Sequence, residues 1–118
     1  VDHLRVASPS GIPRFLADLH ANVEAGEQAV KIVVETDALS RLRSAYDRFD
    51  EAAAADGLEI HHIDQKLEFA IVLFDDEELG LFGYDSGALV GAVFATADDA
   101  VRWGQRLFDR FVDQSAEI

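Results

Sequence analysis

Two adjacent histidines, His61 and His62, carry side chains that commonly bind metals or transfer protons. They lie in an apolar segment, residues 58–63, that predicts a strand. Because consecutive side chains of a strand point to opposite faces of a sheet, the two imidazoles cannot chelate one ion. The acidic run Asp75–Glu78 lacks the alternating ligands and the glycine of a calcium loop, which favours a solvated turn. We therefore predict no metal site.

Nucleophilic and phosphate-binding motifs are absent from the sequence. None of the six serines lies in a Gly-x-Ser-x-Gly turn, and there is no glycine-rich phosphate loop. The chain has no cysteine, so it has no disulfide, thiolate ligand or cysteine nucleophile. We expect no catalytic residue, no cofactor and no enzymatic activity. The alternative is a small cytoplasmic hydrolase or transferase of unknown substrate.

Polar residues follow the first three predicted strands, where a ligand is easiest to place. In α/β sheets ligands bind beyond the carboxyl ends of parallel strands, next to free N–H groups of the following helices. Hydroxyl groups there could bind a polar or anionic small molecule, and a lysine could balance its charge. The alternative is that these residues only cap helices or form turns. The candidate ligand-binding residues are Ser8, Ser10, Thr36, Asp37, His61 and Lys66.

The positions of apolar residues predict the elements that must hold this site. Apolar side chains recur every three or four residues in the predicted helices and in continuous or alternating runs in the predicted strands. In the first half we predict strands over 2–7 and 29–35 and a helix over 13–25. We also predict a second helix that Thr36-Asp37 caps and that ends at Asp56-Gly57. In the second half we predict strands over 58–63, 68–74, 79–84 and 88–95, with a hairpin at 85–87 in which Gly87 takes the left-handed position, and a last helix that residues 96–99 cap.

The predicted order is β-α-β-α-β-β-β-β-α, which is α/β in the first half and α+β in the second. We expect a single mixed β-sheet with the helices packed on it, and one domain over residues 1–118. If the strands of the two leading β-α-β units pair in parallel, we expect a right-handed crossover in each unit. Three consecutive strands in the second half predict an antiparallel meander.

The composition is strongly acidic and poor in lysine. The chain has 23 Asp and Glu against 10 Lys and Arg, only two of them Lys, and a formal net charge of −13. This surface suits the cytoplasm of an extreme halophile, although an ordinary acidic domain is the alternative. It would repel phosphate backbones, so we expect no direct nucleic-acid contact, and no apolar run is long enough to span a membrane. The missing methionine predicts a further segment on the N-terminal side.

Segments of the second half resemble the C-terminal effector domain of archaeal winged-helix transcription regulators, the TrmB-like group in a broad sense, and haloarchaeal members in particular. The resemblance covers residues 29–118 and rests on the order of segments 57–63, 69–76, 87–94, 99–104 and 107–111. It implies an effector-binding and dimerisation domain, with a DNA-binding winged helix on the N-terminal side.

The resemblance also implies a ligand and an assembly. The implied effector is a sugar, a sugar phosphate or a glycolytic intermediate, and the implied assembly is a homodimer. The sheet further resembles the phospholipase-D-like fold. The chain lacks the His-x-Lys pair of those enzymes, so such a domain would bind and not cleave. A dimer scaffold without a ligand is the remaining alternative.

Overall fold

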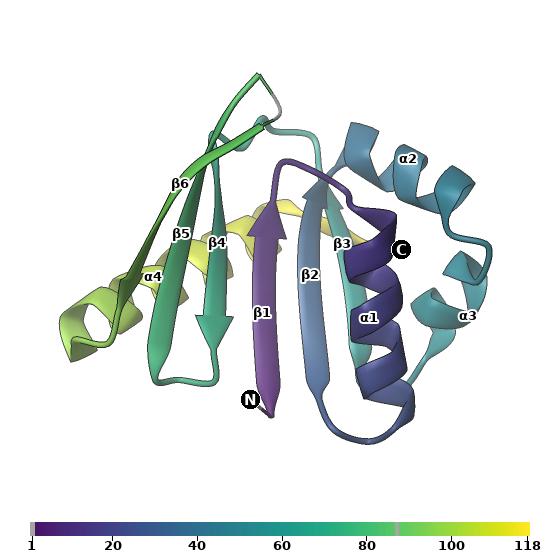
Figure 1. The fold of residues 1–118 in the computed structure, drawn as a ribbon, viewed down its shortest axis with the longest axis horizontal. Coiled ribbons are helices and arrows are strands. Elements are labelled where there is room, and N and C mark those ends of the chain that lie inside the picture. Colours follow the sequence, from purple (N-terminus) through teal and green to yellow (C-terminus); the bar gives the residue numbers. More distant parts are fainter. Residues whose placement is uncertain (1, 87) are drawn as a thin grey trace.

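The computed structural model describes residues 2–86 and 88–118, which form one mixed sheet with helices on both faces (Figure 1). The strand order across the sheet is β6-β5-β4-β1-β2-β3-β7. Along the chain the elements are β1 (His3–Ser8), α1 (Pro13–Glu24), β2 (Ala29–Glu35), α2 (Thr36–Ala45), α3 (Phe49–Ala54), β3 (Leu58–Ile63), β4 (Phe69–Phe74), β5 (Glu78–Asp85), β6 (Ala88–Ala95), α4 (Asp98–Gln114) and β7 (Ala116–Glu117). This confirms the predicted fold class and element order, to which β7 is an addition.

The sheet has a parallel and an antiparallel half that meet at β1. Strand β1 pairs in parallel with β2, which pairs in parallel with β3. On its other side β1 pairs antiparallel with β4, and β4, β5 and β6 form the predicted meander. The two-residue β7 adds antiparallel to β3 at the far edge. The carboxyl ends of β1, β2 and β3 therefore meet at one edge of the sheet, which is the arrangement that the candidate ligand site requires.

Two cores lie on opposite faces of the sheet. Helices α1, α2 and α3 lie over the β1-β2-β3 half of one face, and α4 crosses the other face (Figure 1). Alternation along the strands sends successive apolar residues to different cores. In β2, Ile32 packs in the core under α1–α3, whereas Val33 packs in the core under α4. The four inner residues of β4 are buried, so residues on both faces of this strand are shielded from solvent.

The second predicted helix is interrupted. Helix α2 ends at Ala45 and α3 begins at Phe49, because Tyr46 takes an extended conformation with φ −103° and ψ 110°. The extended residue lets the Tyr46 hydroxyl meet the ring of His20, which is buried in α1. This tertiary hydrogen bond outweighs the continuous helical period of the sequence, in which Tyr46 fits the apolar stripe.

Helix capping also differs from the prediction. The residue that precedes α2 is Glu35, and Thr36 is already helical, so Thr36 does not cap the helix. Ala97 precedes α4, again without a side-chain hydrogen bond to the helix end. Two aspartates do lie in the first turn of α4, where the helix dipole favours negative charge. In the β5–β6 turn Ser86 has φ 52°, and the left-handed conformation predicted for Gly87 lies outside the described residues.

Candidate functional site

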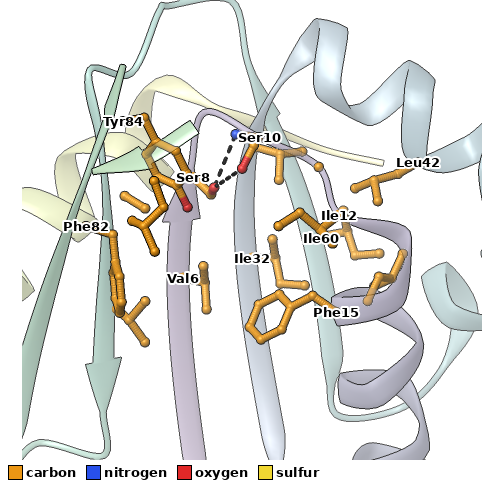
Figure 2. Close-up of a pocket in the computed structure, with 16 residues that line it drawn as sticks. Val6, Ser8, Ser10, Ile12, Phe15, Ile32, Leu42, Ile60, Phe82 and Tyr84 are labelled. Carbon is orange, nitrogen blue, oxygen red and sulfur yellow. Dashed lines mark hydrogen bonds between the residues drawn. The ribbon is translucent and has the colours of Figure 1, made fainter. Parts of the chain in front are cut away.

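A cavity of about 260 Å³ opens on the face that carries α1. It lies between the N-terminal end of α1 and the meander strands (Figure 2). In the described part of the chain, α1, α2 and α3 do not extend over the meander half of this face (Figure 1). The sheet forms its floor, because alternate residues of three parallel strands point into it. The floor residues include Val6 of β1, Ile32 of β2 and Ile60 of β3.

The walls of the cavity come from segments that are far apart in the sequence. The loop after β1 and the first turn of α1 supply one wall, and strands β4, β5 and β6 supply the opposite one. Around the mouth, Ile12, Phe15 and Leu89 are exposed by 53%, 45% and 57%. Exposed apolar side chains that gather around a concave site mark a binding surface. The remaining lining residues are Ser8, Ser10, Gly11, Leu16, Val34, Leu42, Ala70, Val72, Phe82 and Tyr84.

Hydroxyl groups gather at one end of the cavity. The backbone N–H of Ser10 donates to the Oγ of Ser8 at 3.2 Å, and the two Oγ atoms lie 3.3 Å apart. Figure 2 shows the Tyr84 side chain directed toward this pair. In the described part of the chain, no Asp, Glu, His, Lys or Arg lines the cavity. The site can therefore hold a largely apolar molecule and hydrogen-bond one polar group of it.

The cavity holds only two of the six candidate residues, Ser8 and Ser10. Thr36 is engaged at the ends of β2 and β3: its hydroxyl donates to Asp64 Oδ1 at 2.5 Å and lies 3.1 Å from His62 Nδ1. Asp37 and Lys66 do not line the cavity, and both are exposed. The candidate residues from three strand ends therefore do not meet in one site, although the three strands are parallel. Only those after β1 line the cavity.

His61 lies on the other face of the sheet. Its Nδ1 is 3.1 Å from the Oγ of Ser115, after α4, whereas His62 Nδ1 is next to Thr36. The two neighbouring imidazoles point to opposite faces, as the strand period predicted, and have separate partners. The cavity residues that sequence reasoning missed are mainly Phe15, Phe82 and Tyr84. Phe82 and Tyr84 are two positions apart in one strand, which indicates that their side chains share a face. No sequence pattern showed that α1–α3 leave the meander half of that face uncovered.

Comparison with protein families gives one match over nearly the whole chain. Residues 1–114 match the family described as the middle domain of the methanogenesis regulatory protein FilR1. No curated protein sequence matches significantly. In residues 2–86 and 88–118, no helix is long and apolar enough to cross a membrane.

Several solved structures share the fold, and three of them are compared with this chain. The archaeal chromatin protein TrmBL2 superposes with a TM-score of 0.76 at 17% identity, over 99% of this chain and 45% of TrmBL2. NucT from Helicobacter pylori has a TM-score of 0.71 at 7% identity, over 100% of this chain and 83% of NucT. Nuc from Salmonella typhimurium, a phospholipase D family member, has a TM-score of 0.67 at 13% identity, over 99% and 82%. At these identities the similarity is one of fold, and this chain spans less than half the length of TrmBL2.

Proposed function

Because the chain belongs to the family of the FilR1 middle domain, we propose that it is the ligand-sensing domain of a transcription regulator. The fold shared with TrmBL2, an archaeal chromatin protein that binds DNA, supports this proposal. With a net charge of −13, these 118 residues are a poor surface for phosphates. We propose that DNA is contacted through another domain, a winged helix on the N-terminal side.

The observation that carries the sensing role is the cavity between α1 and the meander. Its volume, about 260 Å³, lies just below the range of roughly 300–1,000 Å³ that small-molecule sites have. Apolar walls with a few hydroxyls at one end favour a small, uncharged, largely apolar effector. A sugar, sugar phosphate or glycolytic intermediate stays a prediction, and a phosphate would need a cation that the described lining does not supply.

Thermal unfolding with added compounds tests this role. Two panels are compared in about 1 M KCl, in which the Debye length is near 3 Å: uncharged apolar alcohols, ketones and amides, and sugars with their phosphates. A compound that binds the folded state raises the unfolding midpoint by mass action. We expect the unfolding midpoint to rise with compounds of the first panel. A rise with the second panel alone would indicate that the effector is a carbon metabolite.

A pair of variants locates the binding site. Ala70 is 3% exposed in the cavity wall that β4 supplies, and Ala70→Leu places three further carbons inside the cavity. Ala54 is exposed in α3 and does not line the cavity, so Ala54→Leu is the matched control. Binding should be lost in the first variant and retained in the second. The sensing role would be contradicted if every stabilising compound still stabilised Ala70→Leu. It would also be contradicted if no compound of either panel stabilised the unsubstituted chain.

We propose that the chain forms a homodimer through the edge strand β6. Residues 88–95 contain no charge and no proline, the usual devices that protect an edge strand, and Val90 and Val93 are 67% and 64% exposed. An antiparallel pair of identical edge strands satisfies its own donors and acceptors about a two-fold axis. In so acidic a chain, an uncharged strip is also where two copies repel each other least.

Sedimentation at high salt tests the dimer. Val93→Lys introduces a charge into the strip and should convert a dimer into a monomer of 12.9 kDa. Gln114→Lys introduces the same charge at an exposed position at the end of α4 and should leave the dimer intact. A monomer at every concentration of the unsubstituted chain would exclude this assembly.

The phospholipase D neighbours make an enzyme the alternative. We propose binding without cleavage, because the sequence has no His-x-Lys pair and, in the described part of the chain, no histidine lines the cavity. Turnover of a phosphodiester substrate that Ser8→Ala abolishes would favour the enzyme. The acidic, lysine-poor composition supports a haloarchaeal, cytoplasmic protein, for which the unfolding midpoint should rise from dilute buffer to molar KCl.

A further inference from the structure

Three possible metal ligands meet at the β3–β7 edge, on the face of the sheet that carries α4. Glu59 and His61 are two positions apart in β3, so their side chains share a face. Glu117 of β7 lies directly opposite His61 in the antiparallel register. One ligand atom from each residue, a ring nitrogen and two carboxylate oxygens, lies within 4.8 Å of the others.

The hydrogen bonds of Ser115 determine which nitrogen of His61 carries the proton. The Ser115 hydroxyl donates its single proton to the backbone carbonyl of Val112 at 2.7 Å. Its contact of 3.1 Å with His61 Nδ1 therefore requires an Nδ1–H donor. In the neutral ring the lone pair then lies on Nε2, the atom that a metal ion binds.

The Nε2 atom of His61 is buried and has no hydrogen-bond partner among the described residues. The whole residue is only 8% exposed. A buried acceptor without a partner is energetically unfavourable, so such an atom commonly has a ligand or a role. This observation is independent of the two carboxylates, which are exposed.

We propose that His61, Glu59 and Glu117 bind a divalent transition-metal ion, with Zn²⁺ as the best match. One imidazole and two carboxylates are ligands that zinc accepts, whereas calcium and magnesium prefer oxygen ligands alone. Three protein ligands leave a fourth position for water. The Nδ1 contact to Ser115 supplies the outer-shell partner that orients a ligating histidine.

The ion would fasten the end of the described chain to the sheet. Strand β7 has two residues, and its pairs with β3 are His61 with Glu117 and His62 with Ala116. A metal held by both strands joins the segment after α4 to the sheet edge. This site lies on the face opposite the cavity, so it is separate from the proposed effector site.

Titration of the 118-residue chain with Zn²⁺ and with Co²⁺ tests the site. The titrations are made in about 1 M KCl, where screening weakens diffuse binding to the acidic surface. We expect one ion per chain, and visible absorption from Co²⁺ that reports its inner ligands. Glu117→Gln should lower the Zn²⁺ affinity by at least about tenfold. Glu77→Gln, an exposed substitution in the β4–β5 turn, should leave it unchanged.

Folding of the variants is checked by circular dichroism. Glu117 is exposed, so its substitution should leave the fold intact, and His61→Gln provides a second variant at the buried ligand. An affinity that falls in both variants and persists in Glu77→Gln supports the site. No binding, or binding that is equal in Glu117→Gln and the unsubstituted chain, overturns it.

Discussion

The Nδ1 of His20 lies 2.7 Å from the hydroxyl oxygen of Tyr46, and the two rings meet edge to face with centroids 5.9 Å apart. His20 is only 1% exposed in α1, and Tyr46 lies in the break between α2 and α3. A buried imidazole needs such a partner because its polar atoms cannot reach water. This pair therefore joins the helical layer and explains why the second predicted helix is interrupted at Tyr46.

Removal of the Tyr46 hydroxyl should destabilise the fold. Tyr46→Phe keeps the ring but leaves the buried His20 nitrogen without its partner, which should cost about 1–3 kcal/mol of the free energy of unfolding. Tyr84→Phe removes a hydroxyl from the partly exposed cavity wall and should cost much less. Urea unfolding of both variants measures the difference, and equal losses would contradict a special role of the pair.

Stability should fall in alkaline solution. Burial raises the pKa of Tyr46 above its ordinary value of 10.0, and the neighbouring Arg48 partly opposes this shift. The folded state then retains a proton that the unfolded state loses. The contribution is fully present below pH 10 and is lost as the pH rises through the folded-state pKa. Tyr46→Phe should flatten the decline of the unfolding free energy above pH 10, and an unchanged slope would contradict this origin.

Stability in acidic solution should depend on an ion pair near the break between α2 and α3. Both terminal nitrogens of Arg48 donate to the carboxylate of Glu24, at 3.1 and 2.7 Å. This hydrogen bonding lowers the pKa of Glu24 below its usual 4.5, against partial desolvation. Its stabilisation is present above pH 4.5 and is lost as the pH falls through the lowered pKa. In dilute buffer, Arg48→Gln should reduce the fall of the unfolding free energy below pH 4.5. Molar KCl should reduce the difference between this variant and the unsubstituted chain, because the ion pair is exposed.

Gly104 allows α4 to approach the sheet closely. A Cβ at this position would lie 2.7 Å from Cδ1 of Leu79 and 3.3 Å from Cδ2 of Leu73. Alanine in a helix normally stabilises, but here the clash should reverse the sign and cost about 1–3 kcal/mol. Gly91→Ala in β6 is the control, because its Cβ would meet nothing within 4 Å. Chemical unfolding checks both, and a stabilised Gly104→Ala would show that α4 can shift without cost.

Lys31 competes with the proposed metal for one of its ligands. Its Nζ lies 3.3 Å from Oε2 of Glu59, the cross-strand neighbour on β3. Lys31→Gln should free this carboxylate and raise the Zn²⁺ affinity by about 1.5- to 5-fold, the size expected from a partly exposed ion pair. Isothermal titration measures the change, and a lower affinity would argue that Lys31 positions Glu59 for the ion.

Sequence periodicity predicted the local structure well where one period dominates. The bounds of β2, β3 and β6 are those predicted, because alternating or continuous apolar runs are local signals. The opposite orientation of His61 and His62 also follows from the strand period alone. The helix break at Tyr46 did not, because a hydrogen bond to His20, 26 positions earlier, outweighs the apolar stripe.

The lining of the cavity also depends on contacts between residues that are far apart in the sequence. Ser8 and Ser10 were found because a strand ends there, and that is a local signal. Phe82 and Tyr84 join them only because α1–α3 lie over the other half of this face and do not extend over the meander. This arrangement follows from how the elements pack and not from any single segment.

What the sequence by itself determined is most of the elements, their order and the face that strand side chains take, since these follow from backbone geometry over a few residues. What only the tertiary structure decided is which distant residues meet. Glu117 lies opposite His61 because α4 returns the chain to the edge of β3, where two residues find unpaired backbone groups. Such pairing depends on the packing of a whole helix on the sheet, and no local pattern encodes it.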